Sequence, residues 1–75
     1  MFKNRLKELR KEHCLTQNDL GRILSMTQRS ISRFETGETF PTEEVLNKIA
    51  DLFDVSTDYL LGRTNIRNIY KILEL

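Results

Sequence analysis

Apolar residues recur along this chain at the three- and four-residue spacing of amphipathic helices, in short segments separated by turn residues. In the first segment, one stripe contains Phe2, Leu6, Leu9 and His13, while lysines and arginines take the other faces. We therefore predict a basic amphipathic helix that ends near His13 and Cys14.

Two more helices are predicted between residues 16 and 37, with a very short turn between them. Thr16 followed by Asp19 is a T-x-x-D start signal, because the hydroxyl accepts from a backbone N–H and the carboxylate complements the helix dipole. That helix is expected over residues 17–24, and Thr27 caps the next one, which Gly37 ends. The residues predicted to be buried are Leu20, Ile23 and Leu24 in the first of these helices and Ile31 and Phe34 in the second.

The last two helices follow a loop over residues 38–41. Thr42 is the expected cap of a helix with two glutamates in its first turn, where the helix dipole favours negative charge. Ser56 begins a short fifth helix that Gly62 ends. No segment shows the alternation of a strand, so the predicted fold is all-α. The fourth helix is expected to bury Val45, Leu46, Ile49, Leu52 and Phe53.

The composition is typical of a single folded domain and gives no support to an enzyme. Hydrophobic residues make up 39% of the 75 residues and charged residues 31%. No apolar run approaches the roughly 18 residues that span a bilayer, and no signal-peptide core follows the first residues, so we expect a cytoplasmic protein without membrane contact. His13 is the only histidine and Cys14 the only cysteine, and neither has the partner that nucleophilic catalysis requires.

The same two neighbours raise the question of a metal site. Zinc needs about four ligands, and the sequence supplies no second cysteine or histidine. A lone cysteine also forms no internal disulfide, which fits a reducing compartment. We expect no metal and no cofactor, with His13 and Cys14 in a surface turn.

Charge is distributed unevenly, and the predicted third helix carries side chains suited to nucleic acid. Residues 1–37 have a net charge of +4 and residues 38–75 of −3, although the whole chain carries only +1. With its apolar residues buried, the third helix exposes Gln28, Arg29, Ser32 and Arg33. Arginine forks onto guanine and glutamine pairs with adenine in the major groove of duplex DNA. Helices joined by so short a turn cross steeply as a helix-turn-helix, so we predict that these four residues contact bases.

Five motifs follow one another along the chain: Arg5–Arg10 (RLKELR), Leu15–Leu20 (LTQNDL), Ile31–Gly37 (ISRFETG), Pro41 and Leu52–Gly62 (LFDVSTDYLLG). In this order and spacing they resemble the phage repressor and Cro family, also called the xenobiotic-response-element (XRE) family of helix-turn-helix regulators. The resemblance implies a five-helix repressor-like DNA-binding domain over residues 1–62.

The resemblance also implies roles for single residues. Gln17 would anchor a phosphate, which agrees with the free backbone N–H groups expected at that helix start. Thr16, Thr27 and the backbone near Gly37 would also touch phosphates. Gln28, Arg29 and Arg33 would lie on the recognition helix. Arg10 and Glu35 resemble a partly buried ion pair with a structural role, which ties the first helix to the end of the recognition helix.

Several residues depart from the family pattern. Gly21 stands where the family has alanine, which is expected to weaken the second helix by about 1 kcal/mol. Cys14 and Ser25 stand where glycine is usual, so both turns are expected to be strained. Glu38 and Phe40 replace residues that are often basic or polar, which makes phosphate contacts from this loop doubtful.

Residues 63–75 form a short C-terminal segment that is too apolar for a free tail. As a helix it would align Ile66, Ile69, Tyr70 and Leu73 in one stripe. The segment either folds back on its own domain or pairs with the same segment of a second chain. A two-fold homodimer is what a palindromic operator requires. The natural chain can also continue beyond Leu75.

These observations predict a sequence-specific transcriptional regulator of double-stranded DNA, a repressor that binds a palindromic operator as a homodimer. The competing hypothesis is a protein-interaction module, such as an antitoxin or adaptor, in which the helix-turn-helix no longer binds DNA. Exposed arginines at positions 29 and 33 argue against that alternative.

Overall fold

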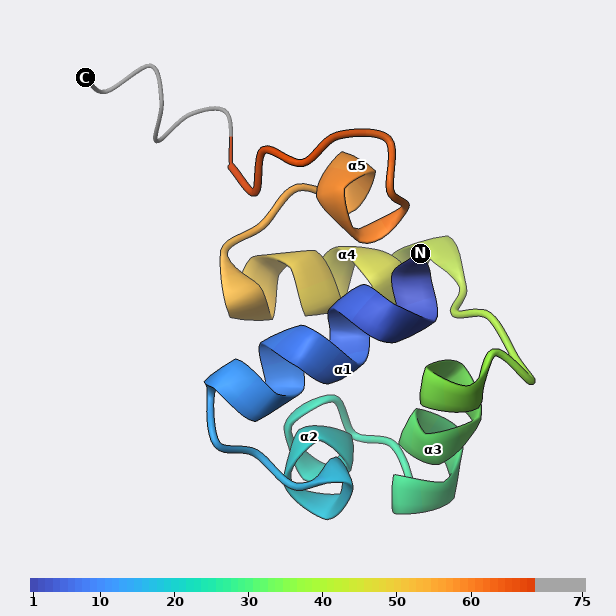
Figure 1. Ribbon diagram of the computed structural model, residues 1–75. Helices are drawn as coiled ribbons and strands as arrows, with labels where there is room; N and C mark the ends of the chain where they lie inside the picture. Colours follow the sequence, from blue (N-terminus) through green and yellow to red (C-terminus); the bar gives the residue numbers. More distant parts are fainter. Residues whose placement is uncertain (69–75) are drawn as a thin grey trace.

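A computed structural model of the chain describes residues 1–68, which contain helices and no strand. The helices are α1 (Phe2–Glu12), α2 (Gln17–Ile23), α3 (Gln28–Thr36), α4 (Glu43–Phe53) and α5 (Thr57–Leu60). In Figure 1, α1 lies between a pair formed by α2 and α3 and a pair formed by α4 and α5. The prediction of a five-helix, all-α fold is confirmed. The longest of these helices have eleven residues, too few to cross a membrane.

Hydroxyl caps determine where four of the five helices begin. Thr16, Thr27, Thr42 and Ser56 each accept a hydrogen bond from the backbone N–H three residues later. At α2 the cap is reciprocal, because the Asp19 carboxylate also accepts from the Thr16 N–H at 3.0 Å. These hydrogen bonds to Thr16 lower the pKa of Asp19. All four caps were predicted from the sequence and are confirmed.

The core is built from one stripe of each helix, and three residues that were expected to be buried are missing from it: Val45, which is only partly buried and packs against the core, Ile23 and Leu52. Ile23 is 51% exposed and Leu52 37% exposed, so both predictions of burial are wrong. The inward positions belong to Leu20 on α2 and to Leu24 at its C-cap, which leaves Ile23 at the rim. On α4 the small residue Ala50 completes the buried stripe, and Leu52 falls on its flank. The buried core consists of Phe2, Leu6, Leu9, Leu20, Leu24, Ile31, Phe34, Leu46, Ile49, Ala50, Phe53, Val55, Tyr59 and Leu60.

The turn between α2 and α3 explains the glycine at position 21. A Cβ built on Gly21 would lie 2.8 Å from the carbonyl oxygen of Met26, and the Met26 N–H donates to the Gly21 carbonyl at 2.7 Å. The glycine therefore permits a close backbone approach, in addition to its cost in helix propensity. Cys14 and Ser25 have φ of 54° and 58°, the left-handed region that favours glycine, as expected for strained turns.

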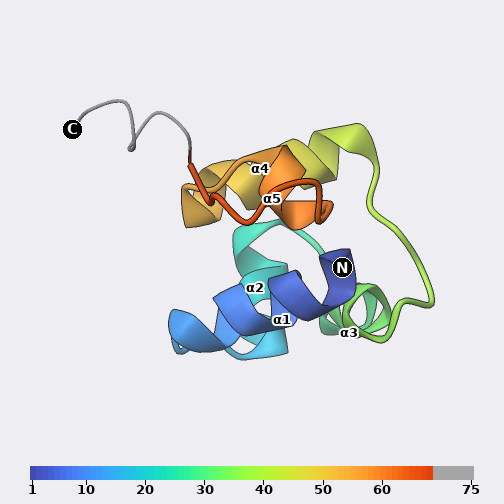
Figure 2. The same ribbon diagram turned by 45° about the horizontal axis from the view of Figure 1, so that its top comes forward.

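The described part of the C-terminal segment packs on its own domain. Arg5 donates to the backbone carbonyls of Tyr59 and Thr64, and its guanidinium lies 4.1 Å from the centre of the Tyr59 ring. Arg67 forms a bidentate ion pair with Glu12 at 2.6 and 2.8 Å. Residues 63–68 run beside α5 in both views (Figures 1 and 2). The stripe expected to pair with a second chain falls mostly on residues 69–75, outside the described residues.

We predict that Gly21→Ala destabilises the domain by about 1 to 3 kcal/mol, because the added methyl group overlaps the Met26 carbonyl. Helix propensity alone predicts a gain of about 1 kcal/mol, so the two explanations differ in sign. Urea unfolding of the variant measures the difference. Arg22→Ala, an exposed change on the same helix, is the control. A more stable Gly21→Ala protein would show that the turn adjusts without cost.

The ion pair of Glu12 and Arg67 predicts a pH dependence of the C-terminal segment. Hydrogen bonding to Arg67 lowers the pKa of Glu12 in the folded protein. The contribution of this pair to the stability of the folded protein is therefore fully present above the unfolded pKa of about 4.3. It is lost as pH falls through the lower pKa of the folded state. NMR titration of the Arg67 guanidinium N–H groups that donate to Glu12 should show this transition below the ordinary pKa of a glutamate. The transition should be absent in Glu12→Gln.

Candidate nucleic-acid interface

The helix-turn-helix consists of α2 and α3, joined by the turn at residues 24–27. Ile31 is fully buried and Phe34 is 5% exposed, so this face of α3 packs on the core. Phe34 also meets the ring of Phe2 edge-on, with centroids 6.2 Å apart. The opposite face of α3 is turned toward the outside of the domain, away from α5 (Figure 1). This packing presents the polar residues of α3 as a rigid surface.

The predicted base-contact residues share that outer face but differ in their surroundings. Gln28 and Arg29 are exposed, and Ser32 and Arg33 are partly buried. Within residues 1–68, Arg29 makes no hydrogen bond or ion pair with another side chain, so its guanidinium is available to a ligand. Nε of Arg33 lies 3.8 Å from a carboxylate oxygen of Glu38.

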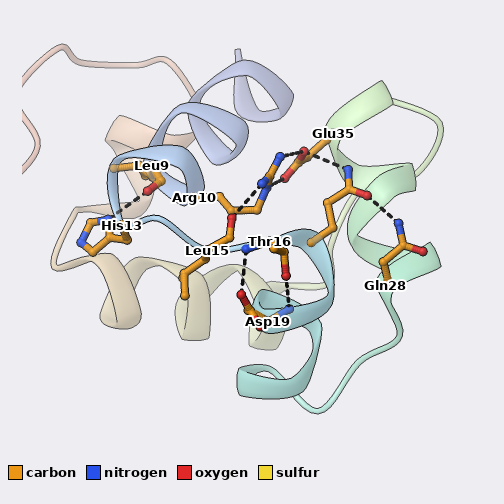
Figure 3. Close-up of polar contacts among 9 residues, drawn as sticks. Leu9, Arg10, His13, Leu15, Thr16, Asp19, Gln28 and Glu35 are labelled. Carbon is orange, nitrogen blue, oxygen red and sulfur yellow. Dashed lines mark hydrogen bonds and ion pairs between the residues drawn. The ribbon is translucent and has the colours of Figure 1, made fainter.

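A chain of hydrogen bonds connects α1 to the start of α3 (Figure 3). Arg10 donates to both carboxylate oxygens of Glu35, at 2.6 and 3.0 Å. The Gln17 amide donates to Glu35 at 3.1 Å, and its carbonyl oxygen accepts from Gln28 at 2.6 Å. The orientation of the Gln17 amide follows from this chain, because a carboxylate only accepts hydrogen bonds. The Gln28 carbonyl oxygen and one of its amide hydrogens therefore remain for a ligand.

Glu35 is the buried centre of this chain. Its side chain is 3% exposed and that of Arg10 11% exposed, so water screens the pair only weakly. Arg10 also donates to the carbonyl of Leu15 at 2.8 Å, which attaches the turn before α2 to the same guanidinium. The hydrogen bond to Glu35 raises the pKa of Arg10. The ion pair that the family resemblance implies is thus present and holds α1, α2 and α3 together.

The pairing of Gln17 with Gln28 was not predicted from the sequence. The sequence predicted a phosphate contact for Gln17 and a base contact for Gln28, with no contact between the two. They are eleven positions apart on different helices, and no helical spacing brings them together. Only the crossing of α2 and α3 places one amide against the other.

The predicted phosphate contacts lie at helix ends, and most of their polar groups already have partners. The hydroxyls of Thr16 and Thr27 accept cap hydrogen bonds at 3.0 and 3.1 Å, which leaves the Thr16 hydroxyl its own hydrogen to donate. The Thr27 hydroxyl also lies 2.9 Å from that of Ser30, and either of these two can be the donor. The first N–H groups of α2, beginning with that of Gln17, have no partner within the helix. Gly37 has φ of 81° and its N–H donates to Phe34, so this amide helps to close the end of α3.

No described residues gather into a metal site. Within residues 1–68, no three side chains of histidine, cysteine, aspartate or glutamate lie together. Cys14 is exposed, and Nδ1 of His13 lies 2.9 Å from the Leu9 carbonyl oxygen. The His13 ring also packs on Phe53, with centroids 4.9 Å apart.

Comparison with known proteins places this geometry among DNA-binding regulators. Residues 6–60 match the helix-turn-helix family. Over 75 residues the chain is 33% identical to antitoxin PezA of Streptococcus pneumoniae, covering all of this chain and 48% of that protein. It is 39% identical over 62 residues to RstR, the cryptic phage CTXphi transcriptional repressor of Vibrio cholerae, covering 83% of this chain and 55% of RstR. The chain therefore spans about half the length of these curated relatives.

A solved structure extends the likeness to three dimensions. The P22 c2 repressor, in complex with the synthetic operator 9T, matches with a TM-score of 0.76 and 30% sequence identity. The match covers 80% of this chain and 91% of that chain. The fold of the described residues is therefore that of a repressor whose structure was solved on DNA.

We predict that Arg10→Ala and Glu35→Ala each destabilise the domain by about 3 kcal/mol, because each leaves the other charge buried without a partner. The melting temperature should then fall by more than about 10 °C for a domain of this size. Arg22→Ala is the matched control, since its ion pair with Asp19 is largely exposed and is worth less than about 1 kcal/mol. Equal effects of the three substitutions would contradict a special role for the buried pair.

Proposed function

Because this chain belongs to the XRE-type helix-turn-helix family of transcriptional regulators, we propose that it binds duplex DNA with α3 in the major groove. The observation that carries this proposal is the outer face of α3, where Gln28 is held by Gln17 and the Arg29 guanidinium is exposed. Preorganised polar groups on a rigid helix are what base reading requires, since flexible side chains lose entropy on binding.

Each residue of that face has a proposed role. Gln28 presents an amide hydrogen that adenine N7 can accept and a carbonyl oxygen that can accept from the adenine N6 amino group. Arg29 and Arg33 carry the forked donors that match guanine. Ser32 lies between them and supplies a hydroxyl to a base of either kind. Together these four residues would read successive bases along one groove.

The ends of α2 and α3 are proposed to meet the phosphates. The N-terminus of α2 offers free N–H groups and the positive end of a helix dipole, with Thr16 and Gln17 beside them. Thr27 caps the start of α3, and Gly37, at the end of α3, is the fourth proposed contact. Gln17 would then have two roles, because it holds Gln28 while it binds the backbone.

A homodimer that represses transcription from a palindromic operator is the finer form of the proposal. A two-fold dimer matches a palindrome because each half-site then meets the same surface. RstR is named a repressor, and the P22 c2 repressor was solved with an operator. Residues 63–68 pack on their own domain, so residues 69–75 are the remaining part of the segment for pairing with a second copy. Such a regulator would act in the cytoplasm, with DNA as its partner, and needs no metal or cofactor.

The likeness to antitoxin PezA supports a second candidate function, since it extends over all 75 residues. In that case the chain would also bind a protein partner through residues beyond the helix-turn-helix. A gel shift with random duplex at low salt separates a DNA-binding protein from a protein-interaction module that does not bind DNA. A DNA-binding protein should shift the duplex, because phosphate contacts alone produce a shift.

We predict that Gln28→Ala and Arg29→Ala each cost about 1 to 3 kcal/mol on the preferred site and much less on random duplex. The preferred site comes from selection of bound sequences in a randomised duplex pool. Fluorescence anisotropy on both duplexes measures the ratio of affinities. If neither substitution changes that ratio, α3 is not the reading helix.

The contact between the two glutamines predicts that their substitutions are not additive on the preferred site. Gln17→Ala removes both a phosphate contact and the support of Gln28, so the loss in Gln17→Ala/Gln28→Ala should be smaller than the sum of the single losses. Gln17 is neutral, and its removal should leave the salt dependence of binding almost unchanged. Additive losses would show that the two amides act independently on DNA.

A further inference from the structure

The end of α3 carries an exposed ion pair whose role is explained neither by packing of the core nor by the proposed base contacts. Nε of Arg33 lies 3.8 Å from Oε2 of Glu38, and their side chains are 41% and 66% exposed. Glu38 follows Gly37, whose left-handed backbone turns the chain sharply at the end of the helix. A carboxylate therefore lies beside an arginine of the proposed DNA surface.

The backbone keeps these two side chains close together. The N–H of Glu38 donates to the carbonyl of Arg33 at 3.0 Å, and the N–H of Thr39 donates to the same carbonyl at 3.3 Å. The residue that bears the carboxylate is thus attached to the residue that bears the guanidinium. Such an anchored pair loses less conformational entropy on contact than two free side chains.

The nitrogens of the Arg33 guanidinium have different surroundings. Its Nε faces Glu38, and within residues 1–68 its two terminal nitrogens take part in no hydrogen bond with another residue. Those terminal nitrogens are the ones that can fork onto guanine. The same nitrogens can also fork onto a phosphate. That contact would bring the Glu38 carboxylate close to a negative charge, whereas the edge of a base carries no net charge.

We propose that Glu38 is a positioning residue that holds Arg33 for base reading and discourages its contact with phosphates. This inference rests on the proposed function, because it assumes that α3 lies on DNA. Its consequence is selectivity. On the preferred operator Arg33 can bind the neutral edge of a base while it stays beside Glu38, whereas on random duplex the available contacts are phosphates, and the Glu38 carboxylate opposes these. Glu38 therefore weakens random binding more than operator binding.

The test is Glu38→Gln, which keeps the shape of the side chain and removes its charge. We expect about three- to tenfold tighter binding to random duplex, with a salt slope steeper by about one unit as Arg33 moves to a phosphate. Operator affinity should change by less than about twofold, so the ratio of operator affinity to random-duplex affinity falls. Glu38 is exposed, and the melting temperature of the variant should equal that of the wild type.

Asp58→Asn is the matched control. Asp58 forms an exposed ion pair with Arg63 at 3.7 Å on α5, and its side chain is 61% exposed, close to the value for Glu38. The Asp58→Asn substitution removes one negative charge from α5, which lies on the side of the domain away from α3 (Figure 1). The control should leave the affinity ratio unchanged, which separates a local effect from an effect of net charge.

Arg33→Gln tests whether Glu38 acts through Arg33. In the Arg33→Gln background, Glu38→Gln should no longer change the ratio of operator to random affinity. If it still changes the ratio, or if it tightens both duplexes equally in the wild-type background, Glu38 is only a repulsive charge and the positioning role is wrong. Unchanged binding by Glu38→Gln to both duplexes overturns this inference alone. Wild-type protein that binds neither duplex overturns the proposed function as well.

Discussion

Glu35 keeps a charged carboxylate with 3% of its side chain exposed, and Arg10 is what makes that possible. A buried charge without a partner would be strongly unfavourable, so the position of the end of α3 depends on α1. Because Gln17 shares the same carboxylate, the start of α2 is oriented by this contact as well. One ion pair thus sets the relative placement of the three helices that form the proposed DNA surface.

The polar chain from Arg10 to Gln28 also connects stability with recognition. Each member has a hydrogen-bond partner, and no described side chain has a buried polar atom without one. The buried end of this network is rigid, because a rearrangement at Arg10 or Glu35 would leave an unpaired group in a medium of low dielectric constant. The reading face therefore inherits its rigidity from the core. The ion pair of Arg33 and Glu38 lies at the other, more exposed end of α3 and is correspondingly weaker.

The C-terminal segment shows how an exposed part of the chain is held in a small domain. Arg5 and Arg67 both lie over the ring of Tyr59, at 4.1 and 5.5 Å from its centre. Arg5 also donates to the carbonyl of Thr64, and Glu12 pairs with Arg67, so residues 63–68 are attached to α1. The helix α1 therefore carries both the recognition unit and the C-terminal segment, on different faces.

Local patterns in the sequence determined the helices, because caps such as Thr16 and Thr27 and the left-handed stop at Gly37 depend on residues only a few positions apart. They also determined which residues of α3 face outward, since the helical period follows from spacing alone. The burial of Ile23 and Leu52 was predicted wrongly, because burial at the flank of a stripe depends on which neighbouring helix covers it.

Only the tertiary structure decided the contacts between helices. The pairing of Gln17 with Gln28 and the close approach at Gly21 arise where α2 crosses α3. The ion pair of Glu12 with Arg67 joins residues 55 positions apart, a separation that no local pattern encodes. The physical reason is the same in each case, because hydrogen bonds and steric contacts act over a few ångströms and depend on how distant segments meet in space.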